Sequence, residues 1–228
     1  GERRRAQARA RLADAAGPLK MAAPAEVEAI ARTGGVTRAE LERLAAEDRI
    51  EIREPDPLPT AAPYPAFRKV QESLDVLGKR HLADFLFEAR LTGPIRLLDG
   101  FAVPGGNLRL DADAVAAAGA RWARRSRDTS TTHADTVLAA LRSGAELPVL
   151  LLYDVVDRLR ERLRQRASEQ ALLRYATDEL GVDRDDARRL VFAVVRETGP
   201  GGGLAGRLRA LLDAGEVFAA AELADAAG

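Results

Sequence analysis

The stretch Leu147-Pro148-Val149-Leu150-Leu151-Leu152 opens the segment 147–196, which decides the fold. Beyond this stretch, large apolar residues recur at spacings of three and four residues: Leu152, Val155, Val156, Leu159 and Leu163. Such spacing predicts an amphipathic helix, because these positions form one stripe on its surface. Pro148 suits the first turn, where a missing N–H costs no hydrogen bond.

The rest of the segment predicts two more helices. The first carries Leu172, Leu173 and Leu180 and ends at Gly181. The second, over residues 185–196, has an apolar stripe formed by Ala187, Leu190, Val191 and Val194. Aromatic residues make up only 4% of the chain, so the core must consist mainly of Leu, Val and Ala. We therefore predict a mainly α fold.

Five arginines alternate along the first of these helices. They are Arg158, Arg160, Arg162, Arg164 and Arg166. On a helix that continues through residue 166, Arg158, Arg162 and Arg166 share one flank. This flank is interpreted either as a solvated surface, paired with acids such as Asp154 and Asp157, or as a docking surface for an acidic partner or nucleic acid. If the helix has a binding function, these three arginines are its predicted protein-binding residues.

Composition excludes several classes of protein. The chain has 228 residues, 46% of them hydrophobic, and equal numbers of basic and acidic residues, 35 each. This charge balance disfavours a dedicated nucleic-acid coat protein. The absence of cysteine excludes disulfides, thiolate zinc sites, iron–sulfur clusters and cysteine nucleophiles.

Location and origin are inferred from the same composition. No apolar run is long enough to span a bilayer and no signal peptide is recognisable, so we expect a cytoplasmic protein without membrane contact. The abundance of Arg, Ala and Gly is typical of a high-GC bacterial genome. Because the chain begins with Gly1, we expect a processed chain or a fragment of a larger protein.

The first 54 residues predict a small helical unit. A polar helix over residues 2–16 is followed by a short helix, a turn at Gly34-Gly35 and a second short helix. Thr37 and Glu40 have the spacing of a capping box at the start of that second helix. Residues 50–53 alternate as a strand does. Five of the eleven prolines lie in residues 55–65, which predicts a linker between this unit (1–54) and a larger helical domain (66–228).

Within the larger domain, the sequence predicts a small β hairpin near residues 95–110. Its expected strands are 95–98, 101–103 and 108–110, with a turn over residues 104–107. A helix is predicted after Asp111 and another from Thr132. Residues 199–203 are interpreted as a hinge before two short helices. The predicted fold class is thus a mainly α multi-helix domain with a minor β hairpin, preceded by a unit like a helix-turn-helix.

One local pattern occurs twice. The stretch 35–44 resembles 181–190: each has Gly-Val before a capped helix, and Arg-Leu one turn after the first inward-facing residue, Leu41 or Ala187. The first copy has the spacing of a helix-turn-helix, which predicts as an alternative function a DNA-binding regulator. Its candidate nucleic-acid-binding residues are Arg38, Arg43, Arg49 and Arg53. Acids near the start of the would-be recognition helix, Glu40 and Glu42, weigh against this alternative because they repel phosphates.

No pattern of catalytic residues supports an enzyme. The glycine-rich string over residues 201–206 follows a predicted helix, whereas a dinucleotide-binding loop follows a strand. Ser130, His133 and Asp135 lie too close together in sequence for a triad. With two histidines and no paired-ligand spacing, we expect no metal and no cofactor. The predicted function is a non-enzymatic protein–protein interaction or regulatory module of unknown oligomeric state; an enzyme with an unlocated site is a third alternative.

Overall fold

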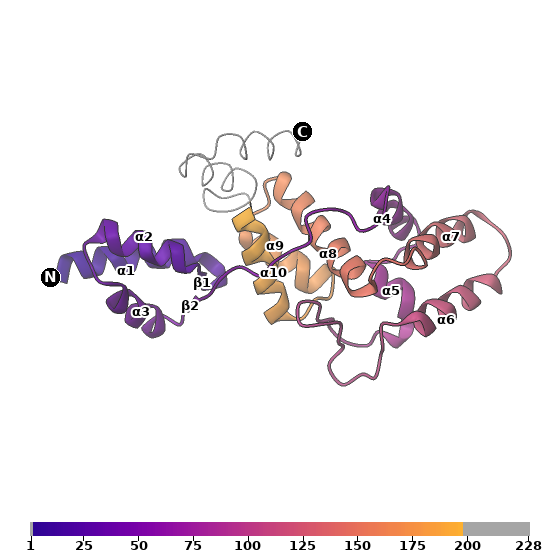
Figure 1. The fold of residues 1–228 in the computed structure, drawn as a ribbon, viewed down its shortest axis with the longest axis horizontal. Coiled ribbons are helices and arrows are strands. Elements are labelled where there is room, and N and C mark those ends of the chain that lie inside the picture. Colours follow the sequence, from indigo (N-terminus) through magenta and orange to yellow (C-terminus); the bar gives the residue numbers. More distant parts are fainter. Residues whose placement is uncertain (1, 198–228) are drawn as a thin grey trace. The chain divides into compact units, whose positions relative to one another are not determined.

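The computed structural model describes residues 2–197 and is mainly helical (Figure 1). The described residues divide into two compact units, residues 2–56 together with 191–197, and residues 57–190. The predicted mainly α class with a minor β component is confirmed. In the described part of the chain, no helix has both the length and the apolarity needed to cross a membrane. The hinge, the glycine-rich string and the two helices predicted after residue 198 lie outside the described residues.

Residues 2–56 of the first unit form three α-helices and two short strands. In chain order these are α1 (Glu2–Ala16), a 3₁₀ turn (Gly17–Leu19), β1 (Met21–Ala22), α2 (Pro24–Gly34), α3 (Arg38–Glu47) and β2 (Glu51–Ile52). The two strands pair in parallel, with Met21 opposite Glu51 and Ala22 opposite Ile52. The second strand was predicted from the alternation over residues 50–53, whereas Met21 and Ala22 of the first strand are both buried and show no alternation.

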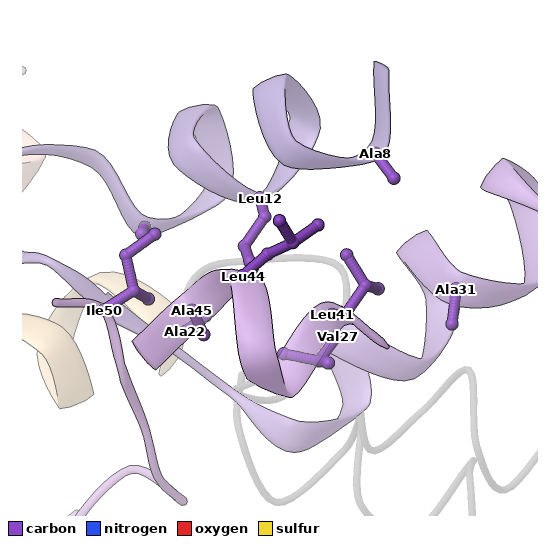
Figure 2. Packing of buried hydrophobic residues seen from close by; sticks show 10 residues of the cluster. Ala8, Leu12, Ala22, Val27, Ala31, Leu41, Leu44, Ala45 and Ile50 are labelled. Atoms are coloured by element: carbon purple, nitrogen blue, oxygen red, sulfur yellow. The ribbon is translucent and has the colours of Figure 1, made fainter. Parts of the chain in front are cut away.

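Side chains from all three helices form the core of this unit (Figure 2). Leu12 of α1 and Leu41 and Leu44 of α3 are fully buried, and alanines between them allow the helices to approach closely. Ion pairs add to this packing on the outside: Arg5 contacts Glu40 and Glu47, and Arg9 contacts Asp48. The polar helix α1 is therefore held by burial of a narrow apolar stripe and by charge pairing with α3.

The repeated sequence pattern has a common backbone geometry. Gly35 and Gly181 both have left-handed φ angles, 61° and 64°. The amide of the following valine bonds back to the preceding helix in each case, Val36 to Ala31 O and Val182 to Ala176 O. Glycine is favoured here because a side chain disfavours positive φ. In the first copy Thr37 accepts a hydrogen bond from Glu40 N at 3.2 Å, as predicted, but the Glu40 carboxylate contacts Arg5.

Helices are the main regular elements of the second unit. Its elements are α4 (Phe67–Val76), α5 (Leu82–Phe87), a 3₁₀ turn (Glu88–Arg90), α6 (Ala112–Ala123), α7 (Thr129–Leu141), α8 (Leu147–Arg164), α9 (Glu169–Arg174) and a π turn (Tyr175–Glu179). Helix α10 (Arg184–Glu197) begins in this unit, and its residues from Val191 onward belong to the first. The predicted apolar stripe of α8 is confirmed, because Val155, Val156 and Leu159 are fully buried.

The predicted start of α7 at Thr132 is wrong. The helix begins at Thr129, and Asp128 is its N-cap. The Asp128 carboxylate accepts from Thr131 N, and Thr131 Oγ1 accepts from Asp128 N, both at 3.0 Å. This reciprocal pair satisfies two donors at the start of the helix and so extends it one turn before Thr132.

The predicted β hairpin over residues 95–110 is reduced to one antiparallel bridge between two of its expected strands, and residues 108–110 form no strand. Only isolated bridges form there, between Ile95 and Val182 and between Arg96 and Ala102. The backbone amides of Leu97 and Leu98 instead donate to one carboxylate oxygen of Asp186, at 2.6 and 3.1 Å. A buried acid at the start of α10 thus replaces the strand partner that the apolar pattern suggested.

Candidate binding groove

An open groove of about 360 Å³ lies between α4 and α8 in the second unit. Polar and charged side chains dominate its walls. The lining residues are Arg68, Gln71, Glu72 and Asp75 of α4, Asp157, Arg158, Glu161, Arg162 and Arg164 of α8, and Gln165 and Tyr175 beyond α8. Two of the three arginines predicted for protein binding, Arg158 and Arg162, therefore line one groove.

The fully buried carboxylate of Asp154 connects the middle of α8 to its neighbours. Its Oδ1 accepts from Arg158 Nε at 3.0 Å and from Gln71 Nε2 at 3.2 Å. Its Oδ2 accepts from the backbone amide of Leu82 at 3.0 Å. A single side chain thus connects α8 to α4 and to the first residue of α5.

Arg158 is a fixed cation at the wall of the groove. Only 13% of its side chain is exposed, and its Nη1 donates to Asp75 at 2.9 Å. Burial disfavours the charged guanidinium, but the charge of Asp154 and the hydrogen bonds to Asp75 and Asp154 outweigh this and raise the pKa of Arg158. Its Nη2 is buried without a hydrogen-bond acceptor among residues 2–197.

Arg162 is held more loosely. Its Nη2 lies 3.7 Å from Glu179 Oε2, and 47% of the arginine side chain is exposed. Its guanidinium carbon lies 4.3 Å from the ring centre of Tyr175. An exposed ion pair of this kind contributes at most about 1 kcal/mol, so another carboxylate can replace Glu179. Tyr175 was not among the predicted site residues, because no sequence pattern indicates that the π turn packs beside α8.

Arg166 does not line the groove. Helix α8 ends at Arg164, two residues earlier than predicted, and Arg166 has a left-handed φ of 64°. Ser168 then caps α9, so α8 and α9 are separate helices. The flank expected to join Arg158, Arg162 and Arg166 is therefore interrupted before its last member. Of the alternate arginines, Arg160 donates to Pro59 O at 2.8 Å and Arg164 pairs with Glu161.

The groove has no excess of positive charge. Its lining contains four arginines and an equal number of carboxylates, and several of these are paired with each other. An acidic partner must therefore compete with carboxylates of the chain itself. The most exchangeable arginine is Arg162, since its ion pair is long and exposed.

The four arginines of the DNA-binding alternative lie in the first unit. Arg38 pairs with Glu42 on α3, and Arg53 pairs with Glu51 and Asp56. Arg43 and Arg49 are exposed, and Arg49 has a left-handed φ of 57°.

Neither histidine forms a catalytic constellation. His133 Nδ1 lies 3.0 Å from Ser73 Oγ, while Asp135 pairs with Arg127 at 2.7 Å. His133 and Asp135 therefore contact other residues rather than each other, and Ser130, His133 and Asp135 do not form a triad. No group of three or more metal-ligating side chains occurs within residues 2–197.

His81 is a structural residue at the start of α5. It is 1% exposed; its Nδ1 accepts from Asp84 N at 3.1 Å, and its Nε2 lies 2.9 Å from Leu180 O. An Nδ1 that accepts an N–H bond cannot also carry a proton, so these contacts define the neutral Nε2–H tautomer. Burial, which outweighs the nearby charge of Asp154, lowers the pKa of His81.

Stability is expected to fall on acidification because of His81. Below the ordinary histidine pKa of about 6.5 the unfolded chain takes up a proton that the folded chain does not, at a cost of up to about 1.4 kcal/mol per pH unit. Urea unfolding of the wild type should therefore show a lower free energy of unfolding at pH 5.5 than at pH 7.5. His81→Asn keeps a capping acceptor and should show a smaller difference. An equal difference in both proteins would assign the pH dependence to other groups.

Comparisons with models of known protein families, with curated proteins and with solved structures found no match for this chain. The proposals below therefore depend on the geometry of the chain alone.

Proposed function

We propose that this chain is a non-enzymatic protein-interaction or regulatory module that binds a segment of another protein in the α4–α8 groove. One observation supports this proposal: the groove brings together a fixed cation, Arg158, an exchangeable cation, Arg162, and an aromatic ring, Tyr175. Arginine and tyrosine are enriched among the residues that contribute most to protein interfaces. Arg166, which is exposed just beyond α8, extends the proposed surface.

The chemistry of the groove favours a segment that carries both charges. A carboxylate of the partner would replace Glu179 beside Arg162, and a basic residue would meet the carboxylates of Asp75 and Glu161. A volume of about 360 Å³ accommodates a few side chains rather than a whole helix face. We therefore propose that the partner contributes a short stretch containing an acidic residue.

The proposal is tested by comparing variants as baits for proteins from the source cell. Arg162→Glu places a carboxylate beside Glu179 and should reduce capture of the specific partner at least about tenfold, since contacts at interface centres contribute about 1.4 kcal/mol or more. Arg109→Glu makes the same charge change at a side chain that is 87% exposed outside the groove. It should capture the partner as the wild type does. Equal capture by all three baits would contradict the proposal.

DNA binding by α3 is a second candidate. The observation in its favour is that both acids that weigh against it are paired within the unit, Glu40 with Arg5 and Glu42 with Arg38. This pairing reduces the repulsion of phosphates. Helix α2, the turn at Gly35 and helix α3 follow one another as in a helix-turn-helix, which supports α3 as the reading helix.

A duplex titration at low salt tests the second candidate. Binding should weaken as salt rises, and Arg43→Ala combined with Arg49→Ala should weaken it at every salt concentration and reduce the salt slope. Arg32→Ala, an exposed residue on α2, serves as the control. Absence of binding at low salt excludes the class. Binding that survives loss of Arg38 and Arg43, which belong to the same predicted site, excludes the site.

A further inference from the structure

A second pocket, of about 300 Å³, lies between α6 and α7. These helices lie side by side and are joined by the loop over residues 124–128 (Figure 1). Arg125, Arg127 and Arg142 line the pocket together with one carboxylate, Asp135. Asp135 pairs with Arg127 at 2.7 Å, so the lining keeps an excess of positive charge. This excess distinguishes the pocket from the charge-balanced α4–α8 groove.

The position of Arg142 depends on a glycine. A Cβ at Gly119 on α6 would overlap the Arg142 guanidinium, whose carbon lies 3.3 Å from that position. Gly119 is buried, and its φ is not left-handed, so backbone conformation does not require glycine here. What the glycine provides is room for the guanidinium against α6. The Arg142 side chain has no hydrogen-bond or ion-pair partner among the described residues.

Trp122 forms part of the same pocket. It is 5% exposed, its ring stacks with Phe85 at 5.9 Å between ring centres, and the Arg125 guanidinium lies 3.9 Å from the indole centre. Arg125 is also 3.7 Å from Glu88. The indole Nε1–H is buried and has no acceptor within residues 2–197. A buried donor without an acceptor is unfavourable, so an acceptor that reached this N–H would stabilise the pocket.

We propose that the α6–α7 pocket binds a phosphate-type oxyanion carried by a small molecule. Guanidinium groups bind such oxyanions through paired, charge-assisted hydrogen bonds. Arg142 supplies a donor fork that no described side chain engages, Arg125 and Arg127 add charge at the loop side, and Trp122 borders the pocket. The volume is at the lower end of the range of small-molecule pockets, about 300–1,000 Å³, which leaves space beyond the phosphate for a small organic group.

Trp122 is the chain's sole tryptophan, so its fluorescence reports on this pocket directly. The experiment titrates the full chain with sodium pyrophosphate at constant ionic strength, with sodium chloride as the compensating salt. We expect a saturable change in Trp122 emission. Arg142→Gln should weaken binding at least about tenfold, because it removes the charge and the paired hydrogen bonds to the oxyanion. Arg109→Gln, which removes the same charge at an exposed site outside the pocket, should bind as the wild type does.

Further variants test the geometry of the site. Arg142→Lys keeps the charge but loses the planar fork and should bind more weakly than the wild type. Arg127→Gln, at a side chain that is 80% exposed, should weaken binding without affecting the fold. Calorimetry under the same conditions detects binding that leaves the emission unchanged. The proposal is overturned if neither method shows saturation, or if Arg142→Gln and Arg127→Gln both bind pyrophosphate as tightly as the wild type.

Discussion

Replacing Asp154 by alanine is expected to lower the free energy of unfolding of the 57–190 unit by about 3–5 kcal/mol, the range for removal of one partner of a buried ion pair. Arg158 would lose its buried counter-ion, and the amide of Leu82 would lose its acceptor. Burial makes each loss costly, because water cannot replace the missing group. Urea denaturation followed by circular dichroism at neutral pH measures the effect.

Asp75→Ala is the matched control for this prediction. Asp75 binds the same guanidinium as Asp154, at nearly the same distance, but 60% of its side chain is exposed. Water can solvate Arg158 Nη1 in its place, so the expected loss is below about 1 kcal/mol. Similar losses for the two variants would mean that burial does not determine the strength of these contacts.

Replacing Asp186 by alanine is expected to cost about 2–4 kcal/mol, because two backbone amides lose one shared acceptor. Asp186 is 4% exposed, and its Oδ2 accepts from both Leu97 and Leu98. The Leu97 side chain is buried as well, so its amide cannot easily turn to solvent. The same denaturation experiment applies, and hydrogen exchange at Leu97 should become faster.

Asp186→Asn separates the hydrogen bonds from the charge. Asparagine keeps one oxygen that can accept from both amides, so this variant should lose only about 1 kcal/mol. It also loses the 3.9 Å contact of the carboxylate with Arg189. If Asn and Ala are equally destabilising, the negative charge rather than the acceptor holds the 95–98 segment.

The fold class could be predicted from the sequence because it depends on local periodicity. The stripe of Val155, Val156 and Leu159 predicted both a helix and its buried side, and the structure has both. Gly35 and Thr37 marked the turn before α3 for the same reason: left-handed backbone and N-capping are properties of single residues.

Predictions of where regular structure ends were less accurate. Arg96 and Ala102 pair as strand residues do, but the amides of Leu97 and Leu98 donate to Asp186, about ninety positions further along the chain. Helix α8 was predicted to continue through Arg166 but ends at Arg164. This difference of two residues separates Arg166 from the flank that carries Arg158.

The sequence by itself determined which segments of this protein are helices, which faces they bury and where several of them begin, since these depend on interactions within a few residues. Only the tertiary structure decided which charges meet. It placed Asp154 against Arg158 and Gln71, brought Tyr175 to Arg162, and seated Arg142 on Gly119 beside Trp122. The physical reason is that the energetic contribution of a charged side chain depends on its burial and its partners. Both are set by helix packing between residues that are far apart in the sequence.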